Sequence, residues 1–190
     1  MGAPTEPDPS EGCGMPAPAD CTPCQADGLD YYVDLPDNYD STRPYPVVFQ
    51  YHPLGGSGEG ARTMYRVEPN FPDAIYVSPD GSDNGFPNQD GRDEAVTREI
   101  MASIEASLCV DRARYFATGF SYGGSMSYTA ACNMSDKFRA VAAMAGAPIS
   151  GASCTREEPE RPVAVLGIHG EADSVLGITQ AEPIIETWME

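Results

Sequence analysis

One pentapeptide, Gly119-Phe120-Ser121-Tyr122-Gly123, carries the residue types that nucleophilic catalysis needs. The two glycines allow a sharp strand-to-helix turn, on which the serine hydroxyl is exposed and the next N–H faces the reacting carbonyl. The aromatic and apolar run 115–118 before it predicts a strand, and the Gly-, Ser- and Ala-rich stretch 121–133 predicts a helix. The sequence therefore predicts Ser121 as a nucleophile and the Tyr122 N–H as an oxyanion donor. The alternative is a serine that only caps the helix.

A second motif supplies the other oxyanion donor. The segment Tyr51-His52-Pro53-Leu54-Gly55-Gly56 resembles the His-Gly-x-Gly-Gly loop of esterases, with Pro53 where glycine is usual. Because proline has no N–H, Leu54 provides the donor, and the two glycines let the backbone approach a substrate. In loops of this type the histidine supports the loop from below. We therefore expect His52 to be a supporting residue and not the base.

An acid follows the apolar run 163–166, in the segment that begins at His169. Asp173 lies 52 residues after Ser121, which agrees with the order serine, acid, histidine of α/β-hydrolases. We predict Asp173 as the triad acid; it could instead cap the next helix, and Glu171 is a weaker candidate. No histidine follows Asp173, and His169 would have to turn back toward Ser121. The sequence thus leaves the general base unassigned.

These motifs lie on a chain in which short β-branched and aromatic runs alternate with helical stretches. That alternation predicts an α/β fold with a mostly parallel central sheet and helices on both faces. The run Val47-Val48-Phe49 is continuously apolar, as a strand covered on both faces should be. An apolar residue every fourth position from Val96 to Leu108 predicts one buried helix stripe. The predicted strands are 31–35, 47–52, 74–78, 115–119, 141–145 and 163–169.

The chain divides into two parts. Residues 1–26 are rich in proline, glycine and acids without apolar periodicity, and predict a tail or linker. Residues 27–190 predict one α/β-hydrolase domain. Within it, residues 79–92 contain several acids that do not match the calcium-loop template, so we expect a solvated loop and no metal.

The composition of the chain limits the classes of partner and the compartment that we expect. The formal net charge is −18 with a single lysine, which argues against nucleic acid and against anionic membranes. No run approaches the length of a membrane span. Six cysteines favour an oxidising compartment, so we expect a secreted, extracellular or periplasmic protein. The Cys21-x-x-Cys24 pair has no second pair at ligand spacing, so we expect no metal and no cofactor. The oligomeric state stays open.

Taken together, the motifs resemble secreted feruloyl esterases and polyhydroxybutyrate depolymerase-like enzymes of carbohydrate esterase family one. The matching segments are 31–40, 52–56, 109–112, 116–124, 131–132 and 169–173. The resemblance implies hydrolysis of carboxylic esters, either of hydroxycinnamates on plant polysaccharides or of polyesters. It assigns Ser121 as nucleophile, Asp173 as acid, and Leu54 and Tyr122 as oxyanion donors. Members carry their histidine in a further C-terminal segment, so the resemblance implies that this chain is truncated.

Two expectations remain. Cys109 precedes the elbow strand and Cys132 lies eleven residues, about three helical turns, after Ser121. Both then lie at the sheet edge opposite the site, which predicts a Cys109–Cys132 disulfide and leaves the other four cysteines unassigned. Two rival functions share the fold: a serine peptidase, and a non-catalytic binding protein suggested by the missing histidine.

Overall fold

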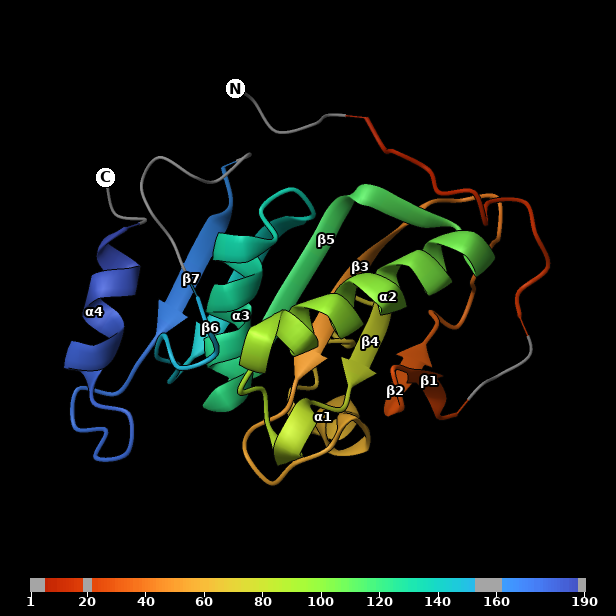
Figure 1. The fold of residues 1–190 in the computed structure, drawn as a ribbon. Coiled ribbons are helices and arrows are strands. Elements are labelled where there is room, and N and C mark those ends of the chain that lie inside the picture. Colours follow the sequence, from red (N-terminus) through yellow and green to blue (C-terminus); the bar gives the residue numbers. More distant parts are fainter. Residues whose placement is uncertain (1–5, 19–21, 153–161, 188–190) are drawn as a thin grey trace.

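The computed structural model describes residues 6–18, 22–152 and 162–187 (Figure 1). A seven-stranded sheet with the order β1-β2-β4-β3-β5-β6-β7 forms its centre. The five strands from β4 to β7 in that order pair in parallel, whereas β2 is antiparallel to β4 and to β1. The predicted α/β fold with a mostly parallel sheet is therefore confirmed. The strands are β1 Cys24–Ala26, β2 Leu29–Asp34, β3 Tyr45–Tyr51, β4 Ile75–Pro79, β5 Val110–Phe120, β6 Phe138–Met144 and β7 Ala164–Ile168.

Within the described residues, four α-helices accompany the sheet: α1 Gly58–Met64, α2 Arg92–Ser107, α3 Tyr122–Asn133 and α4 Ile178–Glu186. Two short 3-10 turns, Ser82–Asn84 and Gln89–Gly91, lie between β4 and α2. Figure 1 shows α2 and α3 side by side on one face of the sheet and α1 near the carboxyl ends of the strands.

The sheet's side chains alternate between two apolar layers. Val47 and Phe49 of β3 pack with the buried faces of α2 and α3 in the main core. Val48, between them in sequence, belongs to a smaller cluster with Ala74 and Tyr76 on the other face. Both layers are needed to bury β3 and β4, whose residues are all buried. The continuous apolar runs in these strands follow from that two-sided burial.

Strand β1 lies inside the region that we predicted to be a tail. It pairs with β2 through a hairpin whose turn residues, Asp27 and Gly28, both have positive φ (45° and 74°). An Asp-Gly pair between two strand-forming runs is a strong signal for such a hairpin. The sequence contains this signal, but the strand was not predicted, because β1 is only three residues long and follows a proline-rich stretch.

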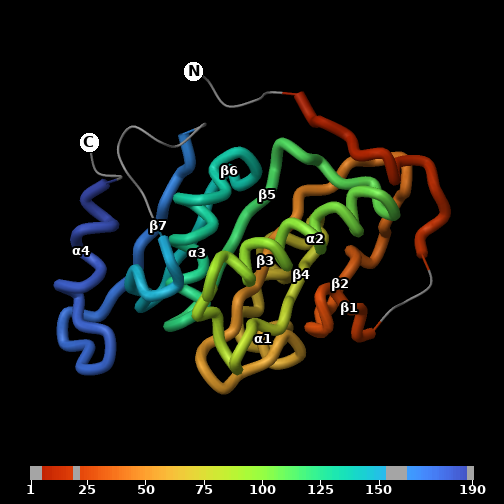
Figure 2. The backbone as a smooth tube through the Cα atoms, in the orientation of Figure 1, coloured from red at the N-terminus to blue at the C-terminus, as the bar shows by residue number. Residues whose placement is uncertain are grey.

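The N-terminal residues also pack on the domain, along the amino end of β5 and the last turn of α2 (Figure 2). The Ser10 N–H donates to the Val110 carbonyl, and its hydroxyl donates to the Leu108 carbonyl (2.6 Å). Cys13 then forms a disulfide with Cys109, across 96 residues of sequence. Residues 6–18 are therefore attached to the sheet and to α2.

The predicted Cys109–Cys132 disulfide is wrong, because Cys109 is bonded to Cys13. Cys132 is itself disulfide-bonded, and its side chain lies in a cluster with Ala143 and Ile184, near β6 and α4. Cys109 lies instead between α2 and β5, where the N-terminal segment reaches it. Spacing along the chain placed both cysteines at one end of the sheet, but it could not show that Cys109 lies beside α2 and β5 whereas Cys132 lies beside β6 and α4.

The β7 side of the sheet is more open than its centre. Leu166 and Ile168 of β7 expose 57% and 51% of their surface, whereas Val47 and Phe49 of β3 expose none. Helix α4 packs beside α3 and β6 through Ile184. Among the helices that the structure describes, none has the length and apolarity of a membrane-spanning segment.

Candidate active site

Ser121 occupies the turn between β5 and α3 with φ 58° and ψ −118°. Few non-glycine residues adopt such a conformation, and it is typical of strained functional turns. The Ser121 N–H donates to the Met144 carbonyl of β6 (2.9 Å), and the Ser121 carbonyl accepts the Ser125 N–H (2.9 Å). Its side chain makes no capping hydrogen bond to α3. The turn thus holds Ser121, a half-buried residue, at the carboxyl edge of the sheet.

The glycines of the pentapeptide are required by close backbone contacts. A Cβ on Gly123 would lie 1.9 Å from the Tyr51 carbonyl oxygen, and one on Gly119 would lie 2.2 Å from the Gly123 backbone. Such distances are far shorter than any van der Waals contact. The helix that follows Ser121 therefore begins directly against the end of β3, which leads into the loop at 52–56.

His52 supports this loop and is fixed as a neutral side chain. Its Nε2 accepts the Gly81 N–H (3.0 Å), so Nδ1 carries the proton and donates to the Pro53 carbonyl (2.8 Å). The ring is 1% exposed and packs on Phe86, with 4.7 Å between ring centroids. Burial lowers the pKa of His52. With both nitrogens occupied in this way, His52 is not available as a base for Ser121.

The loop between β4 and α2 completes the site and was missed by sequence reasoning. A Cβ on Gly85 would contact both Leu54 Cδ1 and Tyr122 Cγ at 3.4 Å, so the side chains of the two predicted oxyanion residues both lie close to this glycine. The Gly55 N–H donates to the Asn84 carbonyl (2.7 Å). This contact ties the loop at 52–56 to the loop between β4 and α2.

Asp93, in the first turn of α2, explains why this loop is ordered. Its carboxylate is 3% exposed and accepts the N–H and hydroxyl of Ser82 (both 2.9 Å) and the Asn88 N–H (2.7 Å). The expectation of a solvated loop holds for Asp83 and Asp90, which are exposed, but it is wrong for the buried positions 81, 82, 85, 86 and 88. A buried carboxylate that accepts several hydrogen bonds can hold a loop in place where few apolar side chains are available to pack.

Asp173 follows β7 at the same edge of the sheet. Its Oδ1 accepts the N–H groups of Val175 (2.8 Å) and Leu176 (3.0 Å), and these hydrogen bonds hold the carboxyl pKa below its usual value. Asp173 is therefore an ionised acceptor, which a triad acid must be. The alternative that Asp173 caps the next helix is wrong, because α4 begins after Gly177 with no side-chain capping hydrogen bond; the two hydrogen bonds of Asp173 lie within its own loop.

His169 is the ring nearest to Asp173. Its Nε2 donates to the Leu176 carbonyl (2.7 Å) and lies 3.8 Å from Asp173 Oδ2. The side chain is 3% exposed, and its buried Nδ1 has no partner among the described residues. Within those residues neither His52 nor His169 makes a hydrogen bond to Ser121. The structure therefore brings together the nucleophile and the oxyanion loop, and it does not add a base.

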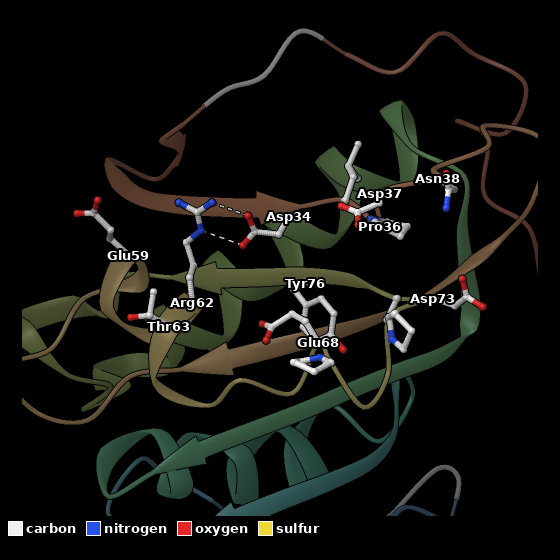
Figure 3. Close-up of a pocket in the computed structure, with 14 residues that line it drawn as sticks. Asp34, Pro36, Asp37, Asn38, Glu59, Arg62, Thr63, Glu68, Asp73 and Tyr76 are labelled. Atoms are coloured by element: carbon white, nitrogen blue, oxygen red, sulfur yellow. Dashed lines mark hydrogen bonds and ion pairs between the residues drawn. The ribbon is translucent and has the colours of Figure 1, made fainter.

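A cavity of about 850 Å³ lies away from this turn, between β2, α1 and the segment before β4 (Figure 3). Arg62 points to Asp34 across it and forms a bidentate ion pair, with Nε 2.8 Å from the carboxylate. Its lining residues come from 34–38, 59–63 and 68–76, so Ser121 and Asp173 are not among them. The nucleophile turn and this cavity are separate features of the molecule.

Comparison with known proteins finds a matching family model and relatives of this chain. A family model described as "Putative esterase" matches residues 27–173. The chain is 39% identical over 176 residues to a "Probable feruloyl esterase C" of Aspergillus terreus, covering 89% of this chain and 64% of the relative. It is 38% identical over 187 residues to feruloyl esterase C of Emericella nidulans, covering 93% and 68%. The chain thus spans about two thirds of the length of these relatives.

A solved structure supports the same fold. A CE1 ferulic acid esterase from Anaeromyces mucronatus, determined in complex with ferulic acid, superimposes with a TM-score of 0.65 at 21% identity. The match covers 84% of this chain and 72% of that one. The match to the family model over most of the sequence, together with relatives near 40% identity, shows that this chain belongs to the esterase family.

Proposed function

We propose that this chain carries the nucleophile and oxyanion hole of a carboxylic ester hydrolase that acts through an acyl-Ser121 intermediate. The single observation that carries the proposal is the backbone of Ser121 (φ 58°, ψ −118°), held against the end of β3 by a glycine contact. This conformation presents the hydroxyl at the carboxyl edge of the sheet, beside the loop at 52–56. Such a strand-turn-helix is the setting that the Gly-x-Ser-x-Gly motif needs.

The reaction has two steps. Ser121 Oγ attacks the ester carbonyl, its proton passes to a base, and the tetrahedral oxyanion is stabilised by the N–H groups of Leu54 and Tyr122. Collapse breaks the bond to the alcohol, which leaves with that proton. Water then attacks the acyl-serine by the same route and releases the acid. Asp173, ionised by its backbone hydrogen bonds, is proposed as the acid that orients the base.

The acyl group that we propose is feruloyl or a related hydroxycinnamoyl group. The support comes from the relatives, which bear the name feruloyl esterase at 38–39% identity. Phe86 is not available to stack on such a ring, since it is 2% exposed and packs on Tyr51 and His52. Polyester substrates remain a less supported alternative. The Cys13–Cys109 disulfide supports our proposal that the protein is secreted.

One observation favours a second candidate, a protein that binds such esters without cleaving them. Neither described histidine makes a hydrogen bond to Ser121, and both have their Nε2 occupied by a backbone group. A serine hydroxyl without a base attacks esters slowly. Binding would then persist without turnover.

Hydrolysis of methyl ferulate and of p-nitrophenyl acetate separates the two candidates. If Ser121 is the nucleophile, Ser121→Ala removes turnover, by about 10³-fold or more, and abolishes acylation of the protein detected by mass spectrometry. Ser107→Ala is the matched control, because its hydroxyl only donates to the Ser103 carbonyl at the end of α2. Saturable binding of methyl ferulate with no acylation in the wild type would favour the non-catalytic candidate. Equal turnover by Ser121→Ala would exclude Ser121 as the nucleophile.

A further inference from the structure

Tyr65 links the two backbone segments that form the proposed site. Its hydroxyl donates to the Tyr51 carbonyl (2.5 Å) and accepts the Phe120 N–H (2.9 Å). Tyr51 is the last residue of β3 and Phe120 is the last residue of β5. One hydroxyl group therefore bridges the ends of two neighbouring strands.

The bridge lies where the two strands stop pairing. The parallel register between β3 and β5 ends with Tyr51 opposite Gly119. Beyond this pair β3 continues into the loop at 52–56, and β5 continues into the turn at Ser121. At the point where the strands separate, the Tyr65 hydroxyl binds the Tyr51 carbonyl and the Phe120 N–H. It therefore continues the hydrogen bonding between β3 and β5 beyond their last paired residues.

Helix α1 delivers this side chain. The helix starts one residue after Ser57, which caps it, and Tyr65 is its C-terminal cap. The loop at 52–56, helix α1 and Tyr65 thus form one continuous segment that returns to the base of the loop. Burial raises the pKa of Tyr65 to about 12, so the hydroxyl keeps its proton and can donate over the neutral range.

We propose that Tyr65 is a positioning residue that sets the distance between Ser121 and the N–H groups of the oxyanion loop. It does not touch the reacting atoms: it holds Phe120, the residue before the nucleophile, against Tyr51, the residue before the loop. This inference rests on the proposed esterase function. Because displacements near 1 Å can reduce a rate by about 100-fold, loss of this bridge acts mainly on kcat.

The test is Tyr65→Phe, which removes the hydroxyl and keeps the ring. We expect kcat for p-nitrophenyl acetate to fall by about 10- to 100-fold with little change in KM, and the Phe120 amide to exchange with solvent faster by NMR. Tyr76→Phe is the matched control. The Tyr76 hydroxyl donates to the Phe71 carbonyl (2.7 Å), and its pKa is likewise raised to about 12, but it contacts neither β3 nor β5 through that bond. This control should keep its kcat.

A second variant separates positioning from simple loss of stability. A fluorinated tyrosine at position 65 keeps the hydroxyl but lowers its pKa, and the phenolate can no longer donate to the Tyr51 carbonyl. We expect kcat to match the wild type at low pH and to fall at a lower pH than in the wild type. The same replacement at Tyr76 should leave the pH profile unchanged. If Tyr65→Phe does not fold, this pH profile decides.

Three outcomes would overturn the inference. They are a kcat of Tyr65→Phe within twofold of the wild type, an equal loss of kcat in Tyr76→Phe, or an unshifted pH profile in the fluorinated protein. If the wild type hydrolyses no ester, the proposed function fails separately. Amide exchange then decides the positioning role: faster exchange confined to residues near 120 and 52–55 in Tyr65→Phe supports it, and unchanged exchange refutes it.

Discussion

The Cys13–Cys109 disulfide gives a quantitative prediction about stability. The bond closes a loop of 96 residues, from the N-terminal segment to the start of β5. In the chain-entropy model a loop near 100 residues lowers the entropy of the unfolded chain enough to add about 4.7 kcal/mol at 25 °C. Total free energies of unfolding are about 5–15 kcal/mol for single domains. We therefore expect this one bond to supply a large share of the stability.

The perturbation is the double substitution Cys13→Ala, Cys109→Ala. We expect the free energy of unfolding, measured by urea titration at 25 °C, to fall by about 3–5 kcal/mol, with strain and residual structure setting the spread. A control separates the bond from the segment it anchors. Ser10→Ala removes the hydrogen bonds of that hydroxyl to Leu108 and Val110 and leaves the disulfide, and should reduce stability by about 1–3 kcal/mol.

Two results would contradict the expected stabilisation by the Cys13–Cys109 disulfide. A loss below about 1 kcal/mol in the double variant would mean that the unfolded chain is not constrained as the loop length implies. Peptide mapping without reduction that joins Cys13 or Cys109 to any other cysteine would mean that the connectivity is wrong. The mapping should precede the titration, because it is independent of the energy scale.

Two further predictions concern the site. Gly123→Ala places a Cβ 1.9 Å from the Tyr51 carbonyl oxygen. We therefore expect the free energy of unfolding, measured by urea titration, to fall by about 1–3 kcal/mol, and acylation of Ser121 to be lost. The control is Gly14→Ala, whose Cβ would lie in open space at φ 84° and which should keep acylation. Burial lowers the pKa of His52 in the folded protein. As pH falls, the unfolded chain therefore binds a proton at this histidine at a higher pH than the folded protein does, and the free energy of unfolding should decline below about pH 6.5. The decline should reach at most about 1.4 kcal/mol per pH unit and should be weaker in His52→Gln; an identical slope in the two proteins would contradict the neutral assignment.

The turn at Ser121 could be predicted because its determinants are local. Gly119 and Gly123 are adjacent to the serine, and the strand and helix on either side have clear patterns. The same is true of five of the six longer strands, whose predicted bounds lie within three residues of the observed ones; β5 begins five residues earlier than predicted. Alternation of strand and helix then leaves few ways to arrange the sheet.

The missed features depend on residues that are distant in sequence. Tyr65 acts on residues 14 and 55 positions away, and nothing in its neighbourhood marks it. The burial of the loop before α2 depends on Asp93, an acid that also fits an ordinary helix N-terminus. The disulfide partner of Cys109 lies in a segment whose composition suggested a detached tail. The assignments of Asp173, Leu54 and Tyr122 stay predictions until their variants are measured.

The open side of the sheet has a practical consequence for work with this chain in solution. Strand β7, Ala164–Ile168, has no charged residue and no proline, and among the described strands it pairs only with β6. An uncharged edge of this kind is a template on which another strand can add. Repulsion from the net charge of −18 opposes such contacts, but salt screens it over about 10 Å at 0.1 M. Added salt should therefore promote self-association of this protein, so that dilute, low-salt buffers are the conditions of choice for spectroscopy.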